Sequence, residues 1–337
     1  MGLSEPLLLI LAACALDALL GDPVYRLHPI RVLGAWVLLG EGWLFRLGLN
    51  GRLGGILLWI MTLAAALGLW WLVHWTLDQL HPGLAFGWDL LIAYSLLCAR
   101  DLLHQGWCVL RALEAQPADQ PPDQPADQPQ HLVPARRVLQ RLVSRDTEHL
   151  PRAGVVRATI ESLSENLTDG VLTPLWALCL FGLPGLILVK AVSTLDSMVG
   201  YKNARYARFG WAGARSDDLV HWLPARLSVL VILLAAALLR LHPRLVIPAA
   251  LKYHGMLPSP NSGWSEAACA GALRVRLVGP IWHQGRLVNE AYMGDPDWPA
   301  ELTAGDLRQA LWLILVASLI ALGIGLMLLP LRGLLTP

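Results

Sequence analysis

The hydrophobic positions of the chain gather into five runs that polar stretches separate. Residues 53–77 and 309–331 are continuous apolar runs. At a rise of about 1.5 Å per residue, each is long enough to cross a hydrocarbon core of about 30 Å. Residues 84–99, 171–189 and 227–241 form shorter or interrupted runs. The pattern predicts a helical chain with about five membrane spans.

The composition favours the same class. Of the 337 residues, 55% are hydrophobic and 15% are charged, with a mean hydropathy of +0.50. Soluble domains carry about a quarter charged residues, so a soluble core of this size would not hide so much apolar surface. We predict an all-α, polytopic integral membrane helical bundle, with one membrane domain over residues 1–337 and with polar loops and helices at the cytoplasmic face. The net charge of +1 gives no field that attracts nucleic acid, and the expected partner surface is the lipid bilayer.

The basic residues orient the bundle. If all five runs span the bilayer, the loops 21–52, 100–170 and 242–308 share one side. They hold 18 Lys and Arg, against 7 on the opposite side. Since the richer side faces the cytoplasm, these loops are predicted to be cytoplasmic.

The run 171–189 complicates this alternation, which would place the polar segment 190–226 outside. Gly182, Pro184 and Gly185 interrupt the run and break a helix in its middle. We therefore interpret it as a re-entrant hairpin that returns the following residues to the cytoplasmic face. The run 227–241 offers a similar alternative.

Two further segments and the cysteines complete the organisation. Residues 6–20 are apolar but short for a span, and no Lys or Arg precedes them, so we expect a retained segment at the interface or against the bundle. Residues 116–130, QPADQPPDQPADQPQ, predict a disordered Pro/Gln-rich loop insert. The five cysteines show no metal or disulfide spacing and are expected to be free thiols.

The first polar stretch with chemical potential is GDPVYRLHPIR at residues 21–31. Its Arg26, His28 and Arg31 are predicted to converge on an anion, because the planar guanidinium group bonds two phosphate or carboxylate oxygens at once. The alternative is a positively charged flank of a membrane helix.

The second stretch, ESLSENLTDG at residues 161–170, is the most informative. In an α-helix, Glu161, Glu165 and Asp169 would share one face at i, i+4 and i+8. Neighbouring like charges at that spacing repel, so the stripe predicts a cation, most simply Mg²⁺ bridging carboxylate and phosphate oxygens. The alternative is a solvated helix face that stops at Asp169.

The third stretch, KAVSTLDSMVGYKN at residues 190–203, carries an acidic group near an apolar run. A continuous helix would place Asp196, Gly200 and Asn203 on one face. Charged groups near the membrane interior are functional-site hypotheses. The alternative is an amphipathic interfacial helix with snorkelling lysines. The flanking lysines are Lys190 and Lys202.

The fourth stretch is PSPNSGWSE at residues 258–266. Its prolines, Asn and Gly predict a turn, after which Ser265 would cap a helix that begins near Glu266. Turn amides at a helix N-terminus form a seat for an anion. A plain loop-to-helix cap is the alternative. The amides concerned belong to Asn261, Ser262 and Gly263.

Common nucleotide, zinc and hydrolase motifs do not occur. The chain has no G-x-x-x-x-G-K-[ST], no G-x-G-x-x-G after a strand, no H-E-x-x-H and no G-x-S-x-G. Its ten His form no helical ligand pair, so a zinc site is not expected. If the protein uses a nucleotide, it does not bind it with a standard P-loop.

Taken together and in this order, the stretches at residues 16–34, 161–175, 190–203 and 258–273 resemble the CbiB/CobD family of cobalamin biosynthesis, the adenosylcobinamide-phosphate synthases. The resemblance implies a multi-pass enzyme of the cell inner membrane whose active site faces the cytoplasm. It implies an ATP-dependent ligase that forms an amide between aminopropanol, or its O-phosphate, and a carboxylate of adenosylcobyric acid. It is compatible with a homo-oligomer or with contacts to other late cobalamin-pathway enzymes.

The residue chemistry, placed on these motifs, assigns roles for ATP and Mg²⁺ chemistry. The metal-site and general-base candidates are Glu161, Glu165, Asp169 and Asp196. The candidates for clamping phosphate and carboxylate are Arg26, His28, Arg31, Lys190 and Lys202, with Lys202 counted among the catalytic groups. Asn166 and Asn203 would orient the substrate, and Asn261, Ser262 and Gly263 would close the site through backbone amides. The alternatives are a non-catalytic AmpE-like membrane sensor, which belongs to a related branch, and a transporter with broken helices at the midplane.

Overall fold

The computed structural model describes residues 4–23, 25–115, 131–143, 145–283 and 286–332. The predicted insert at 116–130 lies outside these residues. The described chain is almost entirely helical, and five stretches are long and apolar enough to cross a membrane. These stretches are Arg52–Leu80, Pro82–Glu114, Arg152–Val199, Trp211–Leu238 and Ala304–Leu331. Four of them contain one of the predicted apolar runs and Trp211–Leu238 contains most of the run 227–241, so the polytopic helical membrane fold is confirmed.

The chain divides into two compact units. The first unit comprises residues 1–100, 170–223 and 321–337, and the second comprises residues 101–169 and 224–320. The helices α9 (Trp211–Leu238) and α12 (Ala304–Leu328) and the π-helix η1 (Leu167–Leu172) each run from one unit into the other. A short 3-10 turn, η3 (Leu329–Leu331), follows α12.

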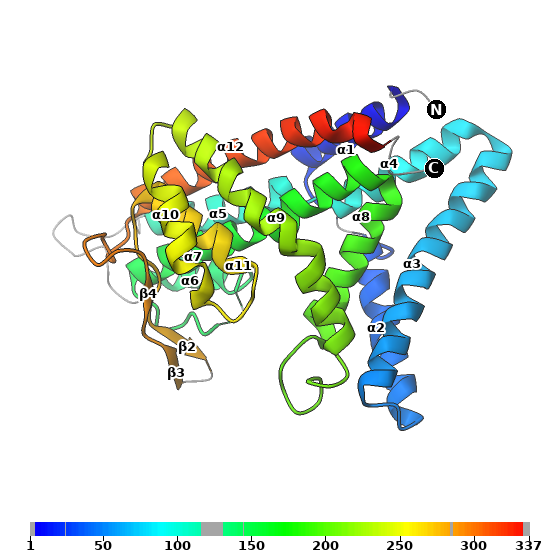
Figure 1. The fold of residues 1–337 in the computed structure, drawn as a ribbon, viewed down its shortest axis with the longest axis horizontal. Coiled ribbons are helices and arrows are strands. Elements are labelled where there is room, and N and C mark those ends of the chain that lie inside the picture. The colour runs from blue at the N-terminus through cyan, green and yellow to red at the C-terminus, as the bar shows by residue number, and fades with distance from the viewer. Residues whose placement is uncertain (1–3, 24, 116–130, 144, 284–285, 333–337) are drawn as a thin grey trace. The chain divides into compact units, whose positions relative to one another are not determined.

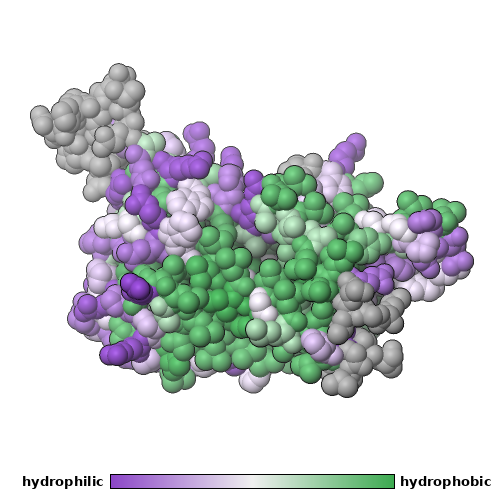
Figure 2. Space-filling view, turned by 90° about the horizontal axis from the view of Figure 1, so that it is seen from above, coloured by the Kyte–Doolittle hydropathy of each residue, from purple (hydrophilic) through white to green (hydrophobic). Residues whose placement is uncertain are grey.

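The first unit is a bundle of apolar helices. Its elements are α1 (Ser4–Leu20), α2 (Pro29–Arg46), α3 (Arg52–Leu80), α4 (Pro82–Leu96) and α8 (Thr173–Val199). Helix α2 packs against α3 and α8, and α1 lies beside α4 (Figure 1). Val37, Leu58 and Phe209 belong to a buried cluster between α2, α3 and the end of α8. Hydrophobic side chains cover much of the face shown in Figure 2, as expected of lipid-contacting helices.

Close backbone contact shapes this core. A Cβ atom at Gly55 of α3 would lie 1.7 Å from the carbonyl oxygen of Phe209, so only glycine fits there. The predicted break in the run 171–189 is confirmed at Gly182, which has φ of 70° inside α8 and whose position favours glycine. The short segment α1 packs against α4 and α8, and its buried Asp17 accepts hydrogen bonds from the amides of Ala99 and Arg100.

The second unit is a smaller helical layer with two short hairpin ladders. Its helices are α5 (Ala99–Glu114), α6 (Val133–Leu139), α7 (Arg152–Asn166), α10 (Pro243–Tyr253), the 3-10 turn η2 (His254–Met256) and α11 (Ser262–Leu273). Helices α10 and α11 lie side by side (Figure 1), and α11 also packs on α7. Strand β1 (Leu277–Val278) pairs antiparallel with β4 (Tyr292–Met293), and β2 (Ile281–His283) with β3 (Arg286–Asn289).

Two details differ from the sequence-based expectation. Residues 227–238 of the predicted run form the last part of the 28-residue helix α9, which begins at Trp211, so the more polar residues 211–226 extend the span and the run's last three residues lie beyond the helix. The four strands at 277–293 were not expected, because each is only two to four residues long. The five cysteines are free thiols, as predicted.

Candidate active site

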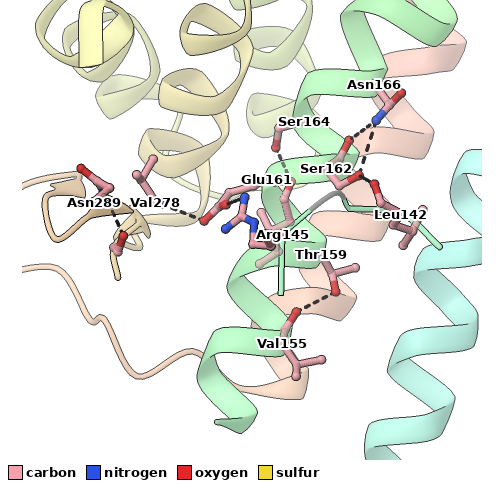
Figure 3. Close-up of polar contacts among 12 residues, drawn as sticks. Leu142, Arg145, Val155, Thr159, Glu161, Ser162, Ser164, Asn166, Val278 and Asn289 are labelled. Carbon is pink, nitrogen blue, oxygen red and sulfur yellow. Dashed lines mark hydrogen bonds and ion pairs between the residues drawn. The ribbon is translucent and has the colours of Figure 1, made fainter. Parts of the chain in front are cut away.

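A buried ion pair forms the centre of the candidate site in the second unit. Glu161 on α7 is only 3% exposed. Its Oε2 accepts a hydrogen bond from Nη2 of Arg145 at 2.6 Å, and its Oε1 accepts one from the amide of Val278 in β1 at 2.8 Å (Figure 3). Three chain segments thus meet on one carboxylate, which joins the loop before α7, helix α7 itself and strand β1.

The π-helix changes the predicted acidic stripe. Glu161 and Glu165 lie on α7, one turn apart as expected, but Asp169 lies in the π-helix η1. The wider π turn shifts Asp169 from the position that a continuous α-helix would give it, so the prediction of one α-helical stripe was wrong at this residue. Single π turns inside α-helices occur frequently at functional sites. The helix does not stop at Asp169 and continues into α8.

Glu266 is an acidic member of this region that the sequence reading did not select. It lies on α11, is 5% exposed, and packs where α11 meets α7. Burial raises the pKa of Glu266 well above its ordinary value, and the charges of Glu161, Glu165 and Asp169 raise it further. Burial and these neighbouring charges therefore favour the protonated form of this carboxyl group. The sequence pattern placed it only at the start of a helix that Ser265 would cap, which gave no sign that its side chain is buried.

The predicted carboxylates do not form a magnesium site as they stand. Both oxygens of Glu161 already accept hydrogen bonds from Arg145 and Val278. Among the described residues, no group of three or more His, Cys, Asp or Glu side chains could hold a metal ion. Asp196, the fourth predicted ligand, belongs to the first unit. The assignment of these carboxylates to Mg²⁺ stays a prediction.

The loop before α7 reaches the site from another side. Ser162 donates a hydrogen bond to the carbonyl of Leu142 at 3.2 Å, and Asn166 donates to the carbonyl of Ser162 at 2.9 Å. The Asn166 amide is thus tied to its own helix (Figure 3). The loop residue Arg145 was absent from the sequence motifs, because nothing in its local pattern distinguishes it from other loop arginines.

A cavity of about 360 Å³ adjoins this loop and the start of α7. Its charged and aromatic lining includes Asp146, Arg157, Tyr292 and Glu301. Arg157 is 7% exposed, and its guanidinium lies 5.0 Å from the centre of the Tyr292 ring. The cavity therefore combines one buried cation with carboxylates, a lining suited to a ligand that carries both charges.

The start of α11 differs from its prediction. The helix begins at Ser262, three residues before the predicted cap, and the Ser265 hydroxyl donates to the Ser262 carbonyl inside the helix. The capping assignment of Ser265 was wrong, because the tight turn at 258–261 starts the helix earlier. The amides of Asn261 and Ser262 donate to Oγ of Ser259. Gly263 packs closely on the His254 carbonyl, where a Cβ would lie 2.0 Å from the oxygen.

The third stretch lies in the first unit and is not one helix. Helix α8 ends at Val199, and Gly200 follows as its cap with its amide on the Asp196 carbonyl. Asn203 lies beyond the helix, where its Oδ1 accepts from the amides of Arg205 and Tyr206. The predicted shared face of Asp196 and Asn203 was therefore wrong. Lys202 is exposed, and Nζ of Lys190 lies 4.0 Å from Sγ of Cys98.

A polar group on α8 and α9 escaped the sequence reading. Oγ of Ser193 lies 2.8 Å from Oδ1 of Asp217 and 3.2 Å from Nε2 of His221. Nδ1 of His221 faces the hydroxyl of Thr173 at 2.9 Å. Because Ser193 and Asp217 share one imidazole nitrogen, this is not the relay of a nucleophilic triad, in which the serine and the acid use different nitrogens.

The first stretch holds the entry to α2. His28 is buried, its Nδ1 accepts from the amide of Ile30, and its Nε2 lies 3.0 Å from Oδ1 of Asp22. These bonds cap α2 and fix the turn before it, a structural role. Arg26 and Arg31 are exposed. Their convergence with His28 on an anion stays a prediction.

Comparisons with known proteins give a family match and several similar proteins. A family model described as CobD/Cbib protein matches residues 10–314. The chain is 39% identical over 292 residues to the cobalamin biosynthesis protein CobD of Pelobacter propionicus, which covers 87% of this chain and 86% of the relative. It is 37% identical over 318 residues to CobD of Photorhabdus laumondii, with 92% and 93% coverage. It is 34% identical over 323 residues to the cobalamin biosynthesis protein CbiB of Salmonella typhimurium, with 94% and 96% coverage. No solved structure matches.

The family match includes the four polar stretches and most of the apolar helices. It supports a role in cobalamin biosynthesis. This chain, a multi-pass helical membrane protein, belongs to the CobD/CbiB family.

Proposed function

We propose that this chain is an adenosylcobinamide-phosphate synthase. It joins aminopropanol, or its O-phosphate, to a carboxylate of adenosylcobyric acid through an amide bond, with ATP as co-substrate. The observation that carries this proposal is the family match over residues 10–314, together with identity of 34% to 39% to relatives named cobalamin biosynthesis proteins.

The reaction has two steps. In the first, the γ-phosphoryl group of ATP passes to a carboxylate oxygen of the corrinoid, which gives an acyl phosphate and ADP. In the second, the amine nitrogen attacks the acyl carbon, the C–O bond to phosphate breaks, and the nitrogen loses a proton. Charge moves in both steps, so positioned cations and a base supply most of the stabilisation.

The second unit offers groups for these tasks. Arg145 and Glu161 act as positioning residues, because their ion pair fixes the loop before α7 against β1. Glu165, one turn along α7 and exposed, is the proposed base for the attacking amine. Glu266, whose pKa burial raises well above its ordinary value, is the proposed proton donor for the departing phosphate. The cavity beside Arg157 suits an amine that also bears phosphate.

The first unit contributes further proposed contacts. We retain Asp196, Lys190 and Lys202 as groups that meet the corrinoid or phosphate. The surplus of Lys and Arg in the loops 21–52, 100–170 and 242–308 supports an inner-membrane location with these loops in the cytoplasm. ATP and the corrinoid would then reach the site from the cytoplasm.

The test is a ligation assay with the full-length protein in detergent or nanodiscs. Adenosylcobyric acid, Mg-ATP and either aminopropanol or its phosphate are supplied, and the corrinoid product is followed by mass spectrometry. Product formation with release of ADP is expected, and the faster amine identifies the substrate. A folded wild-type protein that yields no amide product with either amine would refute the proposal.

Variants locate the chemistry. Glu165→Gln and Lys202→Ala are expected to lower the ligation rate at least about tenfold. Matched controls are Glu290→Gln and Arg208→Ala, since both residues are exposed and neither belongs to the proposed site. If the test variants and the controls react at equal rates, the residue assignment is wrong even where the activity is present.

A further inference from the structure

A second cavity of the second unit is lined by charged and polar residues, with one valine. It has a volume of about 380 Å³, within the range of small-molecule sites. We call it the arginine pocket. Its lining residues are Val133, Arg136, Arg137, Gln140, Arg141, Thr147 and Glu148. None of them lies in a stretch capable of spanning the membrane.

Hydrogen bonds hold the walls of this pocket in place. The guanidinium of Arg136 on α6 donates to the carbonyl of Leu150 through Nε at 2.9 Å and Nη2 at 2.6 Å. Oγ1 of Thr147 contacts the carbonyl of Arg136 at 3.2 Å and Oε1 of Gln140 at 2.8 Å. Helix α6 and the loop before α7 are therefore joined, and a ligand would enter a site that is largely formed.

The charge of the pocket is unbalanced. Arg136 already bonds the Leu150 carbonyl, while Arg137 and Arg141 share the lining with one carboxylate, that of Glu148. Arg137 lies on α6 and Arg141 in the turn directly after it, both are exposed, and they are four positions apart, so their like charges repel. A bound polyanion would turn this repulsion into attraction. Guanidinium groups are suited to phosphate because each bonds two oxygens in one plane.

The loop that forms one wall also reaches the candidate active site. Arg145, which pairs with the buried Glu161, precedes Thr147 by two residues. Asp146 and His149 of the same loop line the cavity beside Arg157. A ligand in the arginine pocket would therefore contact the segment that positions the acidic centre.

We propose that the arginine pocket binds the polyphosphate chain of the nucleotide co-substrate. This inference rests on the proposed ligase function, which requires a nucleotide, and on the lack of a P-loop motif in the sequence. The shared chemistry is a set of phosphate oxyanions, which an anionic lipid headgroup also carries. A nucleotide triphosphate is the better match, because its several adjacent charges can engage the two exposed guanidinium groups, those of Arg137 and Arg141, at the same time.

The test measures the binding of ATP and of inorganic triphosphate to the full-length protein in a neutral detergent, by equilibrium dialysis. The variant Arg137→Gln/Arg141→Gln is expected to raise the Kd for both ligands about tenfold or more. The conservative variant Arg137→Lys/Arg141→Lys should recover part of the affinity. Arg244→Gln removes an exposed arginine of α10 outside the pocket and should change the Kd less than about twofold. Size-exclusion chromatography verifies that each variant is folded.

A parallel arm measures sedimentation of the protein, in nanodiscs of neutral lipid, with vesicles of phosphatidylglycerol. If the double variant loses vesicle binding but keeps the wild-type Kd for ATP, the pocket binds headgroups and the proposal is overturned. It is also overturned if the double variant ligates with an unchanged KM for ATP, an outcome that leaves the ligase function intact. If ATP binding depends on the two arginines while no ligation occurs with any amine, the pocket is supported and the proposed ligase function fails.

Discussion

The ion pair between Arg145 and Glu161 makes a quantitative prediction possible. The two groups lie 2.6 Å apart, with the Glu161 side chain 4% and the Arg145 side chain 21% exposed. At an effective dielectric constant of about 20, the gross attraction at this distance is about 6 kcal/mol. Desolvation offsets most of it, but removal of one partner leaves the other charge buried and unpaired, at a cost of about 3–5 kcal/mol in a fully buried pair. Since Arg145 retains access to water, we expect about 2–4 kcal/mol for Glu161→Gln.

A double-mutant cycle measures the coupling directly. Glu161→Gln, Arg145→Gln and the double variant are compared by chemical denaturation in detergent micelles, which gives the free energy of unfolding of each. Because the second substitution removes the charge that the first one strands, the double variant should be more stable than the sum of the two losses predicts, by at least about 1.5 kcal/mol. Additivity within about 0.5 kcal/mol would show that the two side chains do not interact, and the assignment of Arg145 and Glu161 as a positioning pair would fail.

Three further predictions concern the two units. Gly55→Ala forces a Cβ against the Phe209 carbonyl and should lower the free energy of unfolding by at least about 2 kcal/mol. The control Gly68→Ala, with nothing within 4 Å of its Cβ, should change it by no more than about 1 kcal/mol. Equal melting temperatures of the two variants would contradict the Gly55–Phe209 contact. The raised pKa of Glu266 means that the folded state binds a proton at this carboxyl group more tightly than the unfolded state does. The stability that this proton contributes is therefore lost as the pH rises above the ordinary glutamate pKa of about 4.3 toward the raised value of the folded state. The melting temperature should therefore depend less on pH between pH 4.5 and 8 in Glu266→Gln than in the wild type. An unchanged pH dependence would count against this linkage. Ser193→Ala should keep the ligation rate within about threefold, because Ser193 and Asp217 contact the same nitrogen of His221 and form no nucleophilic triad. For the same reason the wild-type protein should resist labelling by a fluorophosphonate. Covalent labelling at Ser193 would overturn this interpretation.

The sequence predicted the helical framework well because span length and apolar content are local properties. Four of the predicted runs lie within a span-length helix, and the fifth, 227–241, extends only three residues past the end of one. The break at Gly182 was predictable from two glycines and a proline close together. The π turn at Asp169 was not, because no residue type specifies it and a straight α-helix fits the same letters.

The site shows the same division. The acidic residues Glu161 and Glu165 were found because like charges at helical spacing near an apolar run are unusual. Arg145 and the amide of Val278 were missed, because they are 16 and 117 positions away from Glu161 in the sequence and only folding brings them to its two oxygens. The same contacts occupy the carboxylate that the sequence had assigned to a metal ion.

The sequence alone therefore determined the class of protein, its apolar helices, the free cysteines and the polar stretches that carry the family resemblance. These follow from composition, from periodicity and from short motifs. The tertiary structure decided which charges pair, where the α11 helix begins, that Asn203 lies off the α8 helix, and that three arginines share a cavity with Thr147. These features depend on contacts between segments that are distant in the sequence. The buried surfaces and hydrogen bonds that join such segments form only when the chain packs.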